Sequence, residues 1–87
     1  MLRYPVVIDG DKGAYGIVFP DLPGAFAMGA TVDEALADAE DMLPSYVNVM
    51  EAKGQKVPPP SAVEDVELQP GEMVAFVALR HPVAAEG

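Results

Sequence analysis

The side chains that most often carry catalysis are scarce in this 87-residue chain, which has no cysteine and a single histidine, His81. A Ser-His-Asp triad would have to combine His81 with Ser45 or Ser61, and neither serine lies in the sharp turn that typically exposes a nucleophile. The lack of cysteine excludes thiol nucleophiles and cysteine-based zinc sites, and it fits a reducing compartment. We therefore expect no enzyme activity, no cofactor and no metal site.

Glycines cluster near the N-terminus at Gly10, Gly13 and Gly16, a pattern that invites comparison with phosphate-binding loops. Such a loop leads from a strand into a helix, whereas here a second strand follows. Asp9 and Asp11 have the spacing of calcium-loop ligands, but the fifth position of that loop is Gly13, which offers no side chain. The segment therefore predicts a hairpin turn.

Carboxylates are numerous but form no catalytic or metal-binding motif. The chain has 14 acidic and 5 basic residues, and its formal net charge is −9. Nucleic acids and anionic membranes attract basic proteins, so we expect neither as a partner. The segment 31–52 has six acidic residues and no basic one, including Asp33, Glu34, Asp38, Glu40 and Asp41. This series is either a solvated helix face or a surface for a cation-rich protein.

The elements that must position these side chains follow from the hydrophobic pattern. Runs rich in β-branched and aromatic residues predict strands at 4–8, 15–19, 26–30 and 73–79. Apolar residues at helical spacing predict one helix at 32–53. The order β-β-β-α-β predicts an α+β fold in which the helix packs on one face of a small sheet.

The predicted helix has clear signals at both ends and one irregular residue. Thr31 and Glu34 form a capping box, and Gly54 provides a suitable stop. Pro44 lies in the interior, where it removes one backbone hydrogen bond. A kink near residues 40–44 and a break into two helices both remain open, although the apolar stripe continues in register after the proline.

The length allows one domain, which we place at 1–80 and follow with a short tail at 81–87. The proline-rich stretch at 57–61 is expected to be extended, and 61–72 to be a loop. The chain has no signal-peptide pattern at its start, and no apolar run reaches ~18 residues, so we expect a cytoplasmic protein with no membrane partner.

Two motifs closely resemble the HicB-like antitoxin family: YGIVFPDLPG at 15–24 and GATVDEAL at 29–36. The family has a G-Y-G-V-x-F-P-D-L-P-G core, and G-x-T-x-E-E-A-L opens its helix. The segment YPVVI at 4–8 matches the family's first strand, and 57–61 matches its proline-rich connector. The resemblance covers about residues 3–80 and implies a degraded ribonuclease-H-like unit without the catalytic carboxylates.

The resemblance implies an antitoxin of a type II toxin–antitoxin system, which binds a small basic HicA-like ribonuclease toxin and covers its active site. Many family members add a C-terminal DNA-binding domain. This chain ends eight residues after Leu79, so we expect no nucleic-acid binding by this chain alone. The alternative is a stand-alone HicB-like homo-oligomer without a toxin. A residual ribonuclease-H-type enzyme would need acids clustered on strands, which hold almost none.

We expect the toxin contact to join the acidic helix to the loop at 20–24, with Leu22 as an apolar anchor. The predicted contact residues are Pro20, Asp21, Leu22, Asp33, Glu34, Asp38 and Asp41. The last strand has apolar residues on both faces, and one helix can cover only one face of the sheet. We therefore also expect a homodimer or higher homo-oligomer, unless the tail or the 57–72 loop covers the second face.

Overall fold

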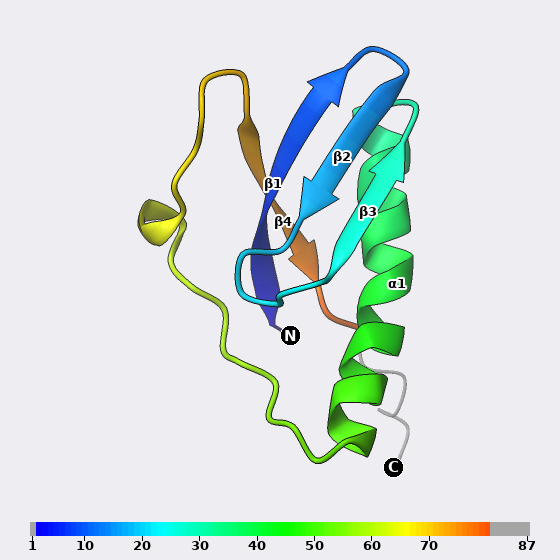
Figure 1. The fold of residues 1–87 in the computed structure, drawn as a ribbon, viewed down its shortest axis with the longest axis vertical. Coiled ribbons are helices and arrows are strands. Elements are labelled where there is room, and N and C mark those ends of the chain that lie inside the picture. The colour runs from blue at the N-terminus through cyan, green and yellow to red at the C-terminus, as the bar shows by residue number, and fades with distance from the viewer. Residues whose placement is uncertain (1, 81–87) are drawn as a thin grey trace.

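A four-stranded antiparallel sheet with one long helix on one face makes up the fold (Figure 1). The structure, a computed structural model, describes residues 2–80, and the predicted tail at 81–87, including His81, lies outside the described residues. The predicted α+β class and element order are confirmed. In chain order the elements are β1 (Arg3–Asp11), β2 (Ala14–Val18), β3 (Phe26–Gly29), α1 (Val32–Ala52), the short 3-10 helix η1 (Val63–Asp65) and β4 (Met73–Ala78).

The last strand lies beside the first, so the sheet order is β3-β2-β1-β4, with every neighbouring pair antiparallel. β1 pairs with β4 from Arg3 onward, but with β2 only from Val7 onward. Pro5 therefore lies where β1 has a neighbouring strand on one side only. A missing backbone N–H leaves no gap in the hydrogen-bond ladder at such a position.

The core lies between the sheet and α1. Side chains alternate along each strand, so every second residue faces the helix. The helix contributes a stripe of residues spaced four apart, namely Ala35, Ala39, Leu43 and Val47, all buried. The absence of a side chain at Gly29 allows α1 to begin close to β3, because a Cβ added there would lie only 2.4 Å from the backbone nitrogen of Ala35. The strand residues of this core are Tyr4, Val6, Ile8, Ile17, Ala27 and Val77.

The ends of α1 follow the predicted signals. The hydroxyl of Thr31 accepts a hydrogen bond from the backbone N–H of Glu34 at 3.0 Å, and the Glu34 carboxylate accepts one from Ala30 at 3.2 Å. Both groups therefore satisfy N–H groups that a helix start leaves open. The helix runs through Pro44 as one element, so the alternative of two separate helices is wrong. Within residues 2–80, no helix has the length and apolar character needed to cross a membrane.

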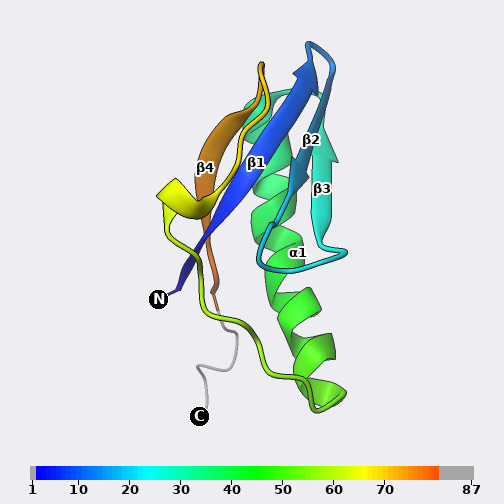
Figure 2. The ribbon, with the colours of Figure 1, turned by 60° about the vertical axis from the view of Figure 1, so that its left-hand side comes forward.

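Residues 53–72, which we refer to as the connector, return the chain from α1 to β4. Figure 2 shows the connector in front of β1 and β4, with α1 behind the sheet. The hydroxyl of Tyr4 donates to the carbonyl of Pro58 at 2.5 Å. On the face away from the helix, Pro5 is fully buried and Val7 is only 7% exposed, whereas Val18 on β2 is 51% exposed. The connector therefore covers β1 on the second face, whereas the β2–β3 half of this face and Phe76 of β4 stay exposed.

Replacing Pro44 by alanine should stabilise the protein, because alanine restores the backbone donor that proline lacks and removes its clash with the preceding turn. We expect the free energy of unfolding to rise by roughly 1–3 kcal/mol, measured by urea denaturation. Ser45→Ala, at the exposed next position, is the control and should change it by no more than ~0.5 kcal/mol. Equal stability of Pro44→Ala and wild type would mean that the helix has relaxed fully around the proline.

Candidate protein-binding surface

The acidic residues of α1 are all exposed, but several have partners within the protein, among them Glu40, whose carboxylate lies 3.8 Å from the Arg80 guanidinium. The Asp38 carboxylate accepts a hydrogen bond from the backbone N–H of Met28 at 3.2 Å, and Glu34 accepts from Ala30. Asp38 thus accepts a hydrogen bond from a backbone N–H of β3, an edge strand in which this group has no neighbouring strand to bond. Among the predicted helix contacts, Asp33 and Asp41 are therefore the better candidates for meeting a partner.

The loop between β2 and β3 is folded into the protein. Leu22 has no exposed surface and belongs to the core cluster together with Phe19 and Ala25. The prediction that Leu22 is an exposed anchor for a partner is therefore wrong, because its side chain anchors the loop itself. The Asp21 carboxylate accepts hydrogen bonds from the Ser61 backbone N–H at 2.9 Å and from the Ser61 hydroxyl, so it binds the connector.

The same loop is also tied to the helix, since the hydroxyl of Tyr46 donates to the carbonyl of Pro23 at 2.6 Å. Of the predicted contact residues in this loop, Pro20 remains exposed. The pairing of Asp21 with Ser61 escaped the sequence analysis because the two residues are 40 positions apart and neither has a distinctive motif. The loop therefore acts mainly as an internal support.

A surface that the sequence analysis did not single out lies on the open half of the sheet. The strand register places Phe26, Val18, Val7 and Val74 in one row, with one residue from each strand. Phe26 is 60% exposed, and Met28, on the same strand and face, is 63% exposed. We refer to Val18, Phe26 and Met28 as the β2–β3 patch.

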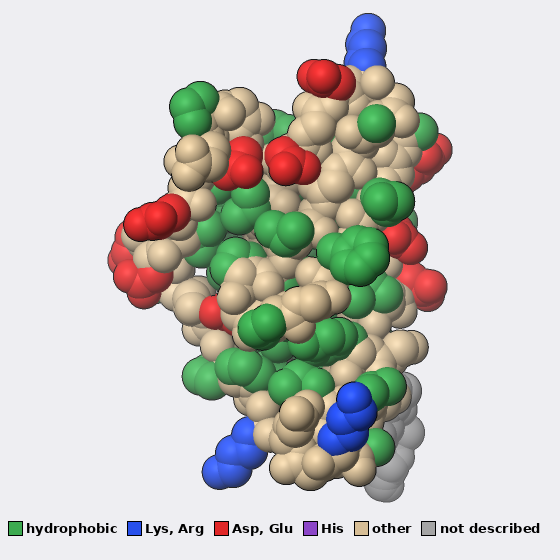
Figure 3. All heavy atoms as spheres, viewed as in Figure 1, with side chains coloured by type: hydrophobic (Ala, Val, Ile, Leu, Met, Phe, Trp, Pro, Cys, Tyr) green, Lys and Arg blue, Asp and Glu red, His purple; other side chains and the backbone are tan. Residues whose placement is uncertain are grey.

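Figure 3 shows apolar side chains gathered over the strands on this side of the molecule, with carboxylates along the upper and lateral margins. The signal for such a patch is present in the sequence. In the segment FAMG, the large residues Phe26 and Met28 alternate with the small residues Ala27 and Gly29, and only the small ones face the helix. Single exposed apolar residues are ordinary on protein surfaces, whereas a contiguous exposed group is a candidate interaction site.

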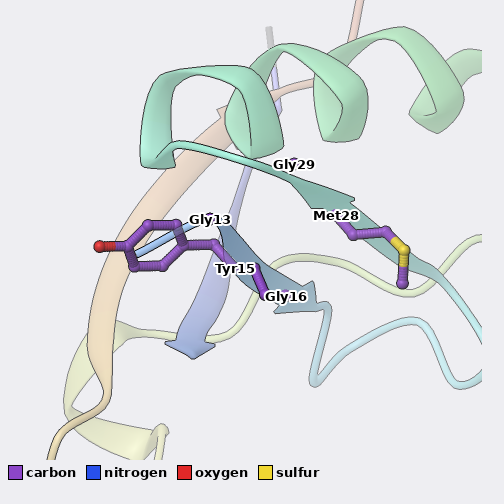
Figure 4. A pocket seen from close by; sticks show the side chains of 6 residues that line it. Gly13, Tyr15, Gly16, Met28 and Gly29 are labelled. Carbon is purple, nitrogen blue, oxygen red and sulfur yellow. The ribbon is translucent and has the colours of Figure 1, made fainter. Parts of the chain in front are cut away.

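The patch adjoins a shallow hollow of about 480 Å³, and in Figure 4 the Tyr15 and Met28 side chains point away from one another there. Gly16 lies opposite Met28 in the register and contributes no side chain to fill the space. A Cβ at Gly16 would lie 3.2 Å from an Asp9 carboxylate oxygen, so that carboxylate lies next to the hollow. The residues that line the hollow are Gly13, Ala14, Tyr15, Gly16, Met28 and Gly29.

Charges are unevenly distributed along the sheet. Asp9 and Asp11 lie at the end where β1 meets β2, together with Lys12 in the turn. The opposite end of the molecule, where β1 begins and where α1 and β4 end, holds the other four bases, Arg3, Lys53, Lys56 and Arg80 (Figure 1). Residues 2–80 contain no group of three or more His, Cys, Asp or Glu side chains placed to hold a metal ion. An apolar centre with a polar rim is the usual arrangement of a protein–protein interface.

Comparison with known proteins places the chain in a family. Residues 4–81 match the model of the HicB_like antitoxin of bacterial toxin–antitoxin systems. This chain belongs to the HicB-like antitoxin family. The resemblance noted in the FPDLPG and TVDEAL segments is therefore confirmed over almost the whole chain.

Individual relatives agree with this assignment. Antitoxin HicB 2 of Photorhabdus laumondii is 33% identical over 79 residues, which are 90% of this chain and 57% of that protein. The chain therefore spans little more than half the length of this relative. The N-terminal domain of the Burkholderia pseudomallei antitoxin HicB is 25% identical, with a TM-score of 0.75 over 91% of this chain and 99% of that one. A chain of the HicA3 and HicB3 toxin–antitoxin complex has the same fold, at 24% identity and a TM-score of 0.74 over 91% of this chain and 99% of that one.

Because Leu22 is buried, its loss should reduce the stability of this HicB-like chain. We expect Leu22→Ala to lower the free energy of unfolding by about 2–4 kcal/mol, since it leaves a cavity between the loop and the core. Urea denaturation measures the change, and Pro20→Ala in the exposed part of the loop serves as the control. Wild-type stability in Leu22→Ala would contradict the internal role assigned to the loop.

The Tyr4 hydroxyl gives the protein a stability that depends on pH. Burial, and secondarily the negative charge of Asp21, raises the pKa of Tyr4 above its usual value of 10.0. Above pH 10 the unfolded chain then loses this proton while the folded chain keeps it, so the free energy of unfolding falls as the pH rises. Tyr4→Phe should remove this contribution and cost about 1 kcal/mol at neutral pH. Parallel stability curves for the two proteins between pH 9 and 11 would contradict the assignment.

Proposed function

We propose that this chain is an antitoxin that binds and inhibits a small, basic HicA-like ribonuclease toxin. The observation that carries the proposal is the family match over residues 4–81. The fold supports it, because a HicB3 antitoxin of the same fold forms a complex with the toxin HicA3. Inhibition requires no chemistry from this chain: a protein that covers the catalytic surface of a ribonuclease denies access to RNA.

Charge supports a basic partner. The net charge of −9 attracts a basic protein over distances of about a Debye length, ~8 Å at physiological ionic strength, and so accelerates the encounter. Asp33 and Asp41 are exposed on α1, whereas Asp38, Glu34 and Asp21 also hold internal hydrogen bonds. Asp33 and Asp41 are therefore the helix residues that we assign to steering.

A stand-alone homo-oligomer is the second candidate function. The exposure of Phe76, which is 43% on the edge strand β4, favours it, because an apolar edge strand can pair with a second copy. Light scattering distinguishes the two candidates. A mass of twice 9.1 kDa, together with no affinity for a HicA-like toxin, would support the homo-oligomer.

Reversing the charge of Asp33 and Asp41 together, with Asp33→Lys and Asp41→Lys, should slow association with an inactivated HicA-like toxin. Loss of steering should reduce the association rate by about threefold to tenfold at low salt and leave the dissociation rate nearly unchanged. Stopped-flow fluorescence at two salt concentrations measures both rates.

The matched control is Glu64→Lys with Asp65→Lys, which alters the net charge equally but lies on η1 of the connector. A smaller effect of the control would assign steering to the helix. Association that depends on neither salt nor the helix substitutions would contradict this role for Asp33 and Asp41.

A further inference from the structure

We propose that the β2–β3 patch (Val18, Phe26 and Met28) is the anchoring surface for the toxin, and that it receives a bulky apolar side chain flanked by Lys or Arg. This inference rests on the proposed antitoxin function and specifies its site. It moves the centre of the contact from the helix and the 20–24 loop to the open half of the sheet.

Exposure and register support an anchoring role. Phe26 and Val18 are paired across β3 and β2, and Met28 follows on the same face, so the three side chains form one apolar area. They are 60%, 51% and 63% exposed, respectively. The energy of a protein interface concentrates in a few apolar or aromatic residues at its centre, with polar residues at the rim. On the helix, Val49 is the one large hydrophobic side chain that is exposed, at 54%, while Tyr46 and Met50 beside it are half-buried, so the helix offers a smaller apolar centre.

The described part of the chain leaves this area open. Among the described segments, the connector is the one that crosses this face. Hydrogen bonds at two places hold it away from the β2–β3 patch. These are the hydrogen bond from Tyr4 to Pro58 and the bonds between Ser61 and Asp21. Val7, which shares the row with Phe26 and Val18, is 7% exposed, so the boundary of the open area falls between β1 and β2.

The chemistry around the patch specifies the partner. The hollow beside Met28 has about 480 Å³ and a floor of glycine backbone, so it can accept one large apolar side chain. Asp9 lies against Gly16 at this hollow, and Asp38 is hydrogen-bonded to the backbone of Met28. A cationic group next to the inserted side chain would meet these carboxylates, which gives charge-assisted hydrogen bonds.

A second copy of the chain is a poorer occupant. Two copies would bring together net charges of −9 each, and a symmetric contact through this patch would place Asp9 and Asp38 of both copies around one interface. Like charges in such a contact oppose association, whereas a basic toxin neutralises them. Charge complementarity therefore favours the toxin.

The test measures binding of the purified full chain to an immobilised, catalytically inactivated HicA-like toxin by biolayer interferometry. Phe26→Thr and Val18→Thr remove apolar surface from the patch while keeping residues that suit a strand. Their matched controls are Phe76→Thr on β4, where the phenylalanine is 43% exposed, and Val63→Thr on η1, where the valine is 42% exposed. Circular dichroism melting confirms that each variant is folded.

We expect Phe26→Thr to weaken toxin binding by about tenfold or more, mainly through faster dissociation, and both controls to stay within about twofold of wild type. Wild-type toxin affinity in both patch variants would overturn this inference and leave the proposed function intact. No toxin binding by the wild-type chain would overturn both. A wild-type dimer that Phe26→Thr converts to a monomer, as seen by light scattering, would assign the patch to a second copy and overturn the inference.

Discussion

A single helix can cover only one face of a sheet, and the arrangement of this protein follows from that constraint. The four strands have apolar side chains on both faces, and α1 buries one of them with its stripe of Ala35, Ala39, Leu43 and Val47. The second face must be covered by other means or remain exposed. The connector crosses in front of β1 and β4 and buries the outward residues of β1, and the half formed by β2 and β3 stays exposed (Figure 2). The proposed toxin surface is therefore the part of the sheet that neither α1 nor the connector covers in residues 2–80.

The position of the connector depends on the β2–β3 loop, which is supported from three directions. Leu22 inserts into the core, Tyr46 reaches the loop from the helix, and Asp21 binds Ser61 of the connector. These contacts link three layers through groups far apart in the sequence. The prolines and the glycine of this loop suggest an exposed recognition segment. In the structure the loop instead links the core, the helix and the connector, and it fixes where the covered part of the sheet ends.

Local signals predicted the elements well. The Thr31–Glu34 cap and the helical stripe located α1, and alternation with turn residues located the strands within a few residues. The candidate site was predicted less well, because burial depends on contacts between distant segments. A leucine in such a loop can be either an exposed anchor for a partner or part of the core. The sequence does not distinguish the two, whereas the structure shows that Leu22 is buried. The outward alternation of Phe26 and Met28 was visible in the sequence, but which face the connector would cover was not.

The hydrogen bond between Asp38 and the backbone of Met28 also limits how copies of this sheet could add to one another. A strand approaching β3 from outside would have to displace the Asp38 carboxylate from the N–H that it would need. Within the described residues, β4 is the other edge of the sheet. Addition through β4 would leave β3 as the free edge of each sheet, and at that edge Asp38 already occupies the Met28 N–H. A carboxylate on the helix thus opposes strand addition at one edge of the sheet, which is one of the ways in which proteins limit edge-to-edge aggregation.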